Sequence, residues 1–354
     1  MIFLPELPPS PGNPAAGHRM IGRYPVHAPK QEQKARRIVS GLFDRVIVFA
    51  GLVALTFFLP RLMPGDPVEL LLSADVVRAL TPDEIEKLRR QFGLGGSWFE
   101  QFIHYLTTLA KGDLGFSLRH ARPVLNLLLH AVPWTALLIL GAMPVYFLLG
   151  LWTGIVSGEQ PHSARDRIVT GAMILVASIP PFAAAIFLLL GFGVIWPILP
   201  ISGAEPLFPP ASSMGRVAAI LRHAILPAAA LALHEVARFF FLARGEAVIL
   251  SARPFILNAR ARGLRGWRLH LHYYGRNILP MALARMSDSI TTLFGAVFFV
   301  EVVFSYPGIG SLIYNAMLER DYILLQGAML GLALVVLSLN WILDALVTRL
   351  VARG

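Results

Sequence analysis

The stretch RGEAVILSARPFILNARARGLRGWRLHLHYYGRNILP, residues 244–280, decides how the rest of the chain is organised. Eight arginines and one acid, Glu246, lie between positions 238 and 276. An arginine at the centre of a bilayer costs roughly 2.5–3.5 kcal/mol on insertion scales, so this stretch cannot lie in hydrocarbon. It is predicted to be a loop on the cytoplasmic side of a membrane, where positively charged loops accumulate.

The middle of this loop is predicted to form a short amphipathic helix over residues 255–264. Its apolar residues recur close to the helical period, and Gly263 is placed to end the helix. The apolar positions are 255, 256, 259, 261 and 264. A helix of this kind needs a surface that buries its apolar side, and two surfaces qualify: lipid headgroups or a partner protein.

The composition indicates a membrane protein. Of 354 residues, 56% are hydrophobic and only 15% are charged, whereas soluble domains are usually about 25% charged. The formal charge of +10 comes with basic residues that flank apolar segments, which indicates membrane topology rather than a nucleic-acid partner. The chain has no cysteine, which excludes disulfides and thiolate chemistry.

Six apolar segments are predicted to span the membrane as helices, which makes the chain an all-α membrane protein. Residues 1–37 are rich in proline, glycine and charge and are predicted to be a disordered cytoplasmic tail, followed by a single membrane domain over 38–354. An even number of spans places both termini in the cytoplasm. The predicted spans are about 38–63, 131–156, 168–195, 223–242, 277–303 and 322–347, with the basic loop at 244–276.

Residues 64–130 are predicted to be an external segment of short helices between the first two spans. Seven basic and eight acidic residues nearly balance there, in contrast to the basic loop. Thr81 and Glu84 have the spacing of a capping box at the start of one helix, and a second amphipathic helix is predicted over 98–112. The segment is too short to be an independent domain.

Two features inside the predicted spans concern helix packing. Gly150, Gly154 and Gly158 recur at every fourth position, which fits either close helix packing or local bending. The sequence Ser178-Ile179-Pro180-Pro181 predicts an unwound or kinked point within the third span.

No motif supports an enzyme. The chain contains no GxxxxGK[ST] phosphate loop, no HExxH zinc motif and no GxSxG elbow. His270 and His272 suit an interfacial loop better than a metal site. We therefore predict no catalytic residue, no cofactor and no metal.

Charged residues within spans are candidates for function by default, because they are costly in a membrane. Glu235 and Arg238 are three residues apart and can neutralise each other on one helix face, and Arg285 and Asp288 repeat this spacing. Two interpretations stay open: ion pairs inside the bundle, or a polar route for a substrate. The candidate path residues are Glu235, Arg238, Arg285, Asp288 and Glu301.

A set of short strings then resembles a known family. Each string is weak, but their order and spacing over residues 38–350 are specific. They are MPGDP (63–67), QFGL (91–94), GDLGFSL (112–118), SIPPF (178–182), LPISG (199–203), HAILPA (223–228), ARARGL (259–264), RNILP (276–280), EVVFSYPGIG (301–310), RDYILLQG (320–327) and NWILD (340–344). The chain resembles the membrane subunits of bacterial binding-protein-dependent ABC importers, and more narrowly the first permease of the dipeptide/oligopeptide/nickel permease family.

The resemblance implies partners, location and role. It implies a bacterial inner-membrane permease that pairs with a second permease, two cytoplasmic ATPases and an external solute-binding protein. Loop 244–276 then looks like an EAA-type loop, in which a short helix inserts into the ATPase, although Leu257 stands where the acid that names the loop is expected. The implied ATPase-coupling residues are Phe255, Ile256, Ala259, Arg260, Ala261, Arg262, Gly263 and Leu264.

The resemblance leaves the solute open. Peptides are expected, and nickel chelates are also moved by members of this family. The alternative from another class is a stand-alone secondary transporter or channel, which predicts inverted repeats and an ion site at the midplane.

Overall fold

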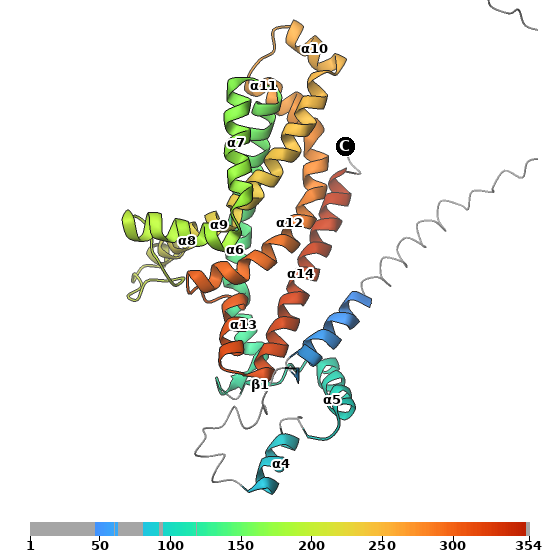
Figure 1. Ribbon diagram of the computed structural model, residues 1–354, viewed down its shortest axis with the longest axis vertical. Coiled ribbons are helices and arrows are strands. Elements are labelled where there is room, and N and C mark those ends of the chain that lie inside the picture. The colour runs from blue at the N-terminus through green and yellow to red at the C-terminus, as the bar shows by residue number, and fades with distance from the viewer. Residues whose placement is uncertain (1–46, 60, 63–80, 92–94, 118, 352–354) are drawn as a thin grey trace, which may run out of the picture. The chain divides into compact units, whose positions relative to one another are not determined.

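The computed structural model describes residues 47–59, 61–62, 81–91, 95–117 and 119–351. The chain divides into two units, Met1–Gly51 and Leu52–Gly354, and the elements below belong to the second unit, except that the helix Ile47–Leu59 begins in the first. Its described part is almost entirely helical, which confirms the predicted all-α membrane protein (Figure 1). The predicted tail 1–37 and residues 38–46, 60 and 63 of the predicted first span lie outside the described residues.

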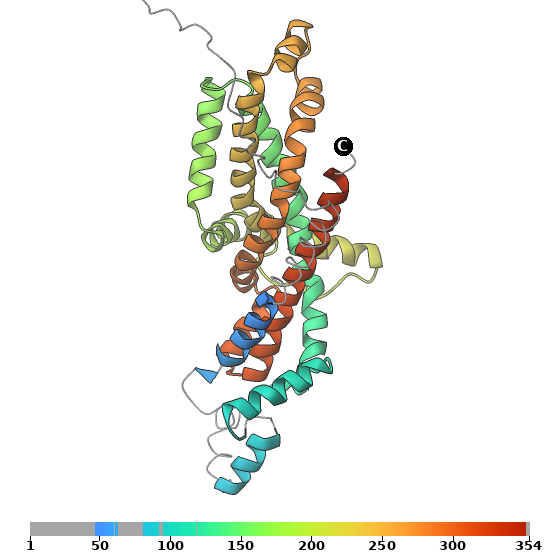
Figure 2. The same ribbon diagram turned by 90° about the vertical axis from the view of Figure 1, so that its right-hand side faces the viewer.

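Two long parallel helices form the centre of this unit. Helix α6 (Val124–Gly158) and helix α9 (Ser213–Ser251) run side by side in the same direction (Figures 1 and 2). The three glycines of α6 lie against α9: a Cβ at Gly154 would be 2.6 Å from the backbone oxygen of Phe240 and 2.7 Å from Cβ of Ala243. Of the two interpretations of this glycine repeat, close packing is therefore the one that the structure supports.

The predicted break in the third span is confirmed. Helix α7 (Ala164–Ser178) ends before Pro180, and helix α8 (Pro181–Leu188) with the π-helix η1 (Leu189–Ile195) continues at 102° to it (Figure 1). Ile179 is extended, with φ −88° and ψ 118°, because a residue that precedes proline is pushed out of the helical region.

The second half of the unit contains helices α10 (Pro254–Ala261), α11 (Trp267–Leu269), η2 (His270–Gly275), α12 (Arg276–Val303), α13 (Ile309–Leu318) and α14 (Tyr322–Val351). Helix α13 was not predicted. Helix α9 extends to Ser251, so the first eight residues of the predicted loop 244–276 are helical. Helices α10 and α13 lie at opposite ends of this unit (Figure 1).

The number of spans is bounded by helix length. Three described helices are long and apolar enough to cross a membrane alone, namely α6, α9 and α14, and up to five spans result if each bent pair counts as one. The part of the predicted first span that is described is the helix Ile47–Leu59. Six spans therefore stay a prediction.

The segment before α6 contains the expected short helices. Helix α4 (Pro82–Gln91) begins after Thr81, whose backbone N–H donates to Oε2 of Glu84 at 2.8 Å. The pKa of the Glu84 carboxyl is lowered, and this hydrogen bond is the largest cause. Helix α5 (Trp98–Ala110) has a second capping box, made by Ser97 and Glu100. Strands β1 (Phe116–Ser117) and β2 (Arg122–Pro123) then form an antiparallel pair that leads into α6.

Candidate functional site

Helix α10 is the short helix predicted in the basic loop. It lies at the end of the unit where α6 and α9 terminate (Figure 1). Pro254 occupies its first turn, where the missing N–H costs nothing. The helix ends through Gly263, whose φ is +81°, with the Leu264 N–H bonded to the Ala259 oxygen at 3.1 Å. Glycine is favoured at a position with positive φ after the last helical turn. The prediction that Gly263 ends the helix is therefore confirmed.

The apolar side of α10 is divided between two environments. Ile256 and Ala259 are buried, at 0% and 2% exposure, in a cluster with Ile155 and Leu269. Leu257 and Phe255 instead remain 52% and 40% exposed. Of the other predicted coupling residues, Ala261, Arg262 and Gly263 are exposed and Leu264 is half-buried. The helix thus has one face that is held by the unit and one that is free.

Arg260 belongs to the held face. Its guanidinium donates to the backbone oxygen of Glu159 at 3.1 Å and to the hydroxyl of Tyr274 at 2.9 Å. The Glu159 carboxylate also lies 2.6 Å from Nε2 of His270, and the Tyr274 hydroxyl lies 2.8 Å from Oγ of Ser251. These contacts tie α10 to the ends of α6 and α9 and to η2, which continues directly into α12.

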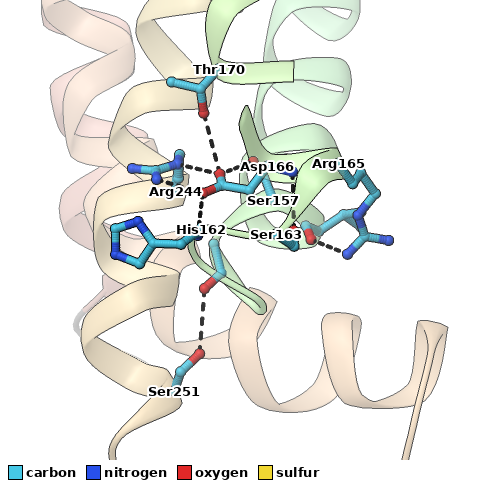
Figure 3. Close-up of polar contacts among 10 residues, drawn as sticks. Ser157, His162, Ser163, Arg165, Asp166, Thr170, Arg244 and Ser251 are labelled. Carbon is cyan, nitrogen blue, oxygen red and sulfur yellow. Dashed lines mark hydrogen bonds and ion pairs between the residues drawn. The ribbon is translucent and has the colours of Figure 1, made fainter. Parts of the chain in front are cut away.

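A second network, centred on Asp166, lies at the same end (Figure 3). Arg244 of α9 binds the Asp166 carboxylate with both Nε and Nη2, at 2.7 and 2.8 Å. Ser157 donates to the same carboxylate at 2.5 Å, the His162 backbone N–H at 2.9 Å and Thr170 at 3.2 Å. Asp166 is only 2% exposed, and every one of its carboxylate contacts is with a donor.

Sequence analysis did not identify Asp166. The available signal was local: Ser163 caps α7 through the Asp166 N–H at 3.1 Å, so Asp166 is an acid in the first turn of a helix. Nothing in the local pattern indicates its partner Arg244, which is 78 residues away.

The charged residues of the predicted path form the expected ion pairs. Arg238 lies 2.8 Å from Glu235, and Arg285 lies 3.0 Å from Asp288. Arg238 also donates to Thr292 at 2.9 Å, which joins α9 to α12. Both arginines line one cavity between these helices.

Glu301 has a different environment. It is 0% exposed, and its carboxylate accepts hydrogen bonds from the Thr135 hydroxyl at 2.6 Å and from the backbone N–H groups of Gly310 and Ser311 at 2.7 and 3.2 Å. These contacts hold the N-terminus of α13 against α6 and α12. A role of Glu301 in a path stays a prediction.

Within the described ranges, no group of three or more His, Asp or Glu side chains has the geometry to hold a metal ion. His270, one of the two histidines considered in the loop, has Glu159 as its Nε2 partner.

The sequence of the chain matches known membrane transport proteins. Residues 147–353 match the family described as the binding-protein-dependent transport system inner membrane component. The chain is similar to a putative peptide permease protein of Brucella ovis, at 30% identity over 83% of this chain and 91% of the relative. It is similar to the di/tripeptide transport system permease protein of Pseudomonas aeruginosa, at 30% identity over 84% of this chain and 92% of the relative. The dipeptide transport system permease protein of Escherichia coli is 27% identical over the same two shares, 84% and 92%.

Proposed function

The chain belongs to the family of binding-protein-dependent transport system inner membrane components, and from this premise we propose that it carries peptides across the membrane. It is a membrane-embedded permease subunit of an ABC importer and is non-catalytic, because ATP hydrolysis takes place on separate subunits. The relatives from Brucella ovis, Pseudomonas aeruginosa and Escherichia coli are all named for peptides, which supports peptides as the solute. The alternative of a stand-alone secondary transporter or channel is set aside.

Such permeases work with ABC transporter partners. For this chain we propose a second, similar permease, two cytoplasmic ATPases and an external solute-binding protein in a bacterial inner membrane, with both termini cytoplasmic. Helix α10 is then the part that contacts an ATPase, and the end of the unit that carries α13 faces the binding protein. The arginine-rich composition of residues 238–276 supports this orientation.

The observation that carries the coupling role is the division of α10 into two faces. Leu257 and Phe255 offer apolar surface that the described residues leave exposed, which suits a cleft on another protein. Ile256, Ala259 and Arg260 hold the helix on the unit. The predicted coupling set therefore separates into residues that touch the ATPase (Phe255, Ala261, Arg262, Gly263) and residues that transmit its motion (Ile256, Ala259, Arg260, Leu264).

The tethers of α10 give a physical route for that motion. Arg260 joins α10 to Glu159 at the end of α6, and through Tyr274 to the segment that leads into α12. A displacement of α10 by the ATPase therefore moves α6 and α12 together rather than bending a free loop. Helix α12 carries the Arg285–Asp288 pair and, together with α9, lines the cavity that Arg238 and Arg285 share.

Gly263→Glu tests this assignment. The added side chain meets open space in this chain but projects from the exposed end of α10. We expect ATP-driven peptide uptake by the assembled importer to fall at least tenfold, while membrane insertion and yield stay normal. Gly263→Asn is the matched control, because asparagine tolerates positive φ and adds no charge; it separates backbone strain from the clash with the ATPase.

Full uptake by the Gly263→Glu importer would refute the coupling role of α10. If the wild-type importer hydrolyses ATP in response to its binding protein but accumulates no peptide, the peptide assignment fails and the coupling role stands.

A further inference from the structure

A cavity of about 320 Å³ lies between α9 and α12. Its lining combines cationic and apolar groups, and none of the lining residues is acidic: Arg238, Phe239, Phe241, Leu242, Arg285 and Ser289. The two arginines come from different helices and reach the same space.

Both arginines line this cavity, and each keeps N–H donors that are not bonded to the described residues. A guanidinium has five N–H donors. In Arg238 the contacts with Glu235 and Thr292 use Nη1, and in Arg285 the contact with Asp288 also uses Nη1. Among the described residues, Nε and Nη2 of both arginines have no hydrogen-bond partner, and the side chains are 32% and 56% exposed.

The position of Arg285 within α12 argues against a lipid environment. Arg276 begins α12, so Arg285 lies about 14 Å along the helix at about 1.5 Å per residue. An arginine at such depth costs roughly 2.5–3.5 kcal/mol in hydrocarbon, and intramembrane charges almost always face the bundle interior or water. The exposed face of Arg285 must therefore meet water or a polar ligand within the assembled importer.

From these observations, and resting on the proposed function, we propose that this cavity is a subsite for the carboxylate group of a peptide in transit, bound by Arg238 and Arg285. A planar guanidinium binds a carboxylate through two parallel N–H···O bonds. Phe241, which is 37% exposed, and Leu242 provide apolar surface for an adjoining side chain of the peptide.

The acidic partners explain why such a subsite releases its ligand. Glu235 and Asp288 neutralise the two arginines, so the peptide carboxylate meets hydrogen-bond donors without a large excess of positive charge. A site within a transport path has to bind strongly enough for entry and weakly enough for exit. Two compensated arginines meet this condition better than two bare ones.

Arg285→Gln is the most direct test, in the complete importer reconstituted in vesicles with its binding protein and a dipeptide. The Arg285–Asp288 pair is exposed, at 56% and 59%, so the substitution does not leave a buried charge. In Arg238→Gln, by contrast, Glu235, which is 1% exposed, would lose its partner. We expect the maximal rate of dipeptide uptake to fall about tenfold, with unchanged ATPase stimulation by the binding protein and therefore more ATP used per dipeptide.

Two variants make this result specific. Thr153→Val removes a hydroxyl of α6 that bonds to Leu149 and Gly150 and does not line the cavity, and it should leave uptake within about twofold. Arg285→Lys retains the charge without the bidentate fork and should recover uptake to within about threefold of wild type.

Wild-type uptake by Arg285→Gln would overturn the subsite. Equal losses of uptake and of stimulated ATPase activity in both Arg285 variants would also overturn it, because they would assign Arg285 to assembly or coupling. If the wild-type importer itself accumulates no dipeptide while its ATPase responds to the binding protein, the failure belongs to the proposed function instead.

Discussion

The two ends of the unit hold a buried carboxylate in opposite ways. Beside α10, Asp166 is bound by the guanidinium of Arg244 and is thus half of an ion pair. Beside α13, Glu301 is bound by one hydroxyl and two backbone N–H groups, and no cation among the described residues contacts it. Their exposures are nearly the same, 2% and 0%, and their partners differ.

The difference has a mechanical consequence. The Asp166–Arg244 pair joins two helices that are 78 residues apart in sequence, at the end proposed to receive the motion of the ATPases. The Glu301 contacts fasten a short helix to its neighbours by hydrogen bonds that bind the start of α13. The first arrangement links α7 to α9, and the second holds the start of α13 against α6 and α12.

The largest effect is expected for Arg244→Ala. Removal of one partner from a buried pair costs about 3–5 kcal/mol, and we expect the low end here because Arg244 is 25% exposed and Asp166 keeps three other donors. Thermal unfolding of the purified subunit in detergent, followed by tryptophan fluorescence, should show this as a clearly lowered midpoint. Arg165→Ala is the control, because Arg165 precedes Asp166 in α7 but is exposed and donates to the backbone oxygen of Val156 instead of a carboxylate (Figure 3). Equal midpoints for the two variants would show that the pair does not stabilise this end.

A smaller effect is expected for Glu301→Gln. The amide keeps an oxygen that accepts from Gly310 and Ser311, and no cation is left without a partner. The hydrogen bond with Thr135 must reverse its direction, so the cost is about 1–2 kcal/mol, in the range for one disturbed buried hydrogen bond. The same unfolding measurement applies, with Glu319→Gln, a partly exposed acid near the C-terminus of α13, as control. A loss as large as that of Arg244→Ala would contradict the distinction between the two ends.

The smallest effect is expected for Thr170→Val, an isosteric change beside Asp166. The Thr170 contact is the longest to that carboxylate, at 3.2 Å, and the other donors remain. We expect a loss of about 0.5 kcal/mol, at the low end for one net hydrogen bond. Thr153→Val is the control, since the Thr153 hydroxyl bonds only to its own helix, at Leu149 and Gly150. A loss above about 1.5 kcal/mol would mean that Asp166, like Glu301, depends on neutral donors.

Features that depend on neighbouring residues were predictable. The capping box of Thr81 and Glu84, the break at Pro180 and the end of α10 at Gly263 all follow from rules that operate over a few residues. The pairs Glu235–Arg238 and Arg285–Asp288 were also predictable, because three residues along a helix bring side chains to the same face.

Features that depend on the relative position of two helices were not predictable. The partner of Asp166 is set by how α7 lies beside α9, and the inward direction of Arg260 by how α10 packs on α6. Helix α13 has only 10 residues, and its start is stabilised by Glu301 and Thr135, which precede it by 8 and 174 residues. A single sequence carries no signal that residues so far apart along the chain come into contact.

The sequence by itself determined that this chain is a helical membrane protein and that a basic loop lies between two of its apolar segments. It also determined where several helices begin, break and end. Apolar composition, arginine distribution and the special backbone of proline and glycine act locally, so each is visible in the order of residues. Only the tertiary structure decided which face of α10 is free, which buried acids meet a cation, and that Arg238 and Arg285 share one cavity. Those outcomes depend on how long helices pack against one another, and packing is a property of the assembled helices rather than of any one of them.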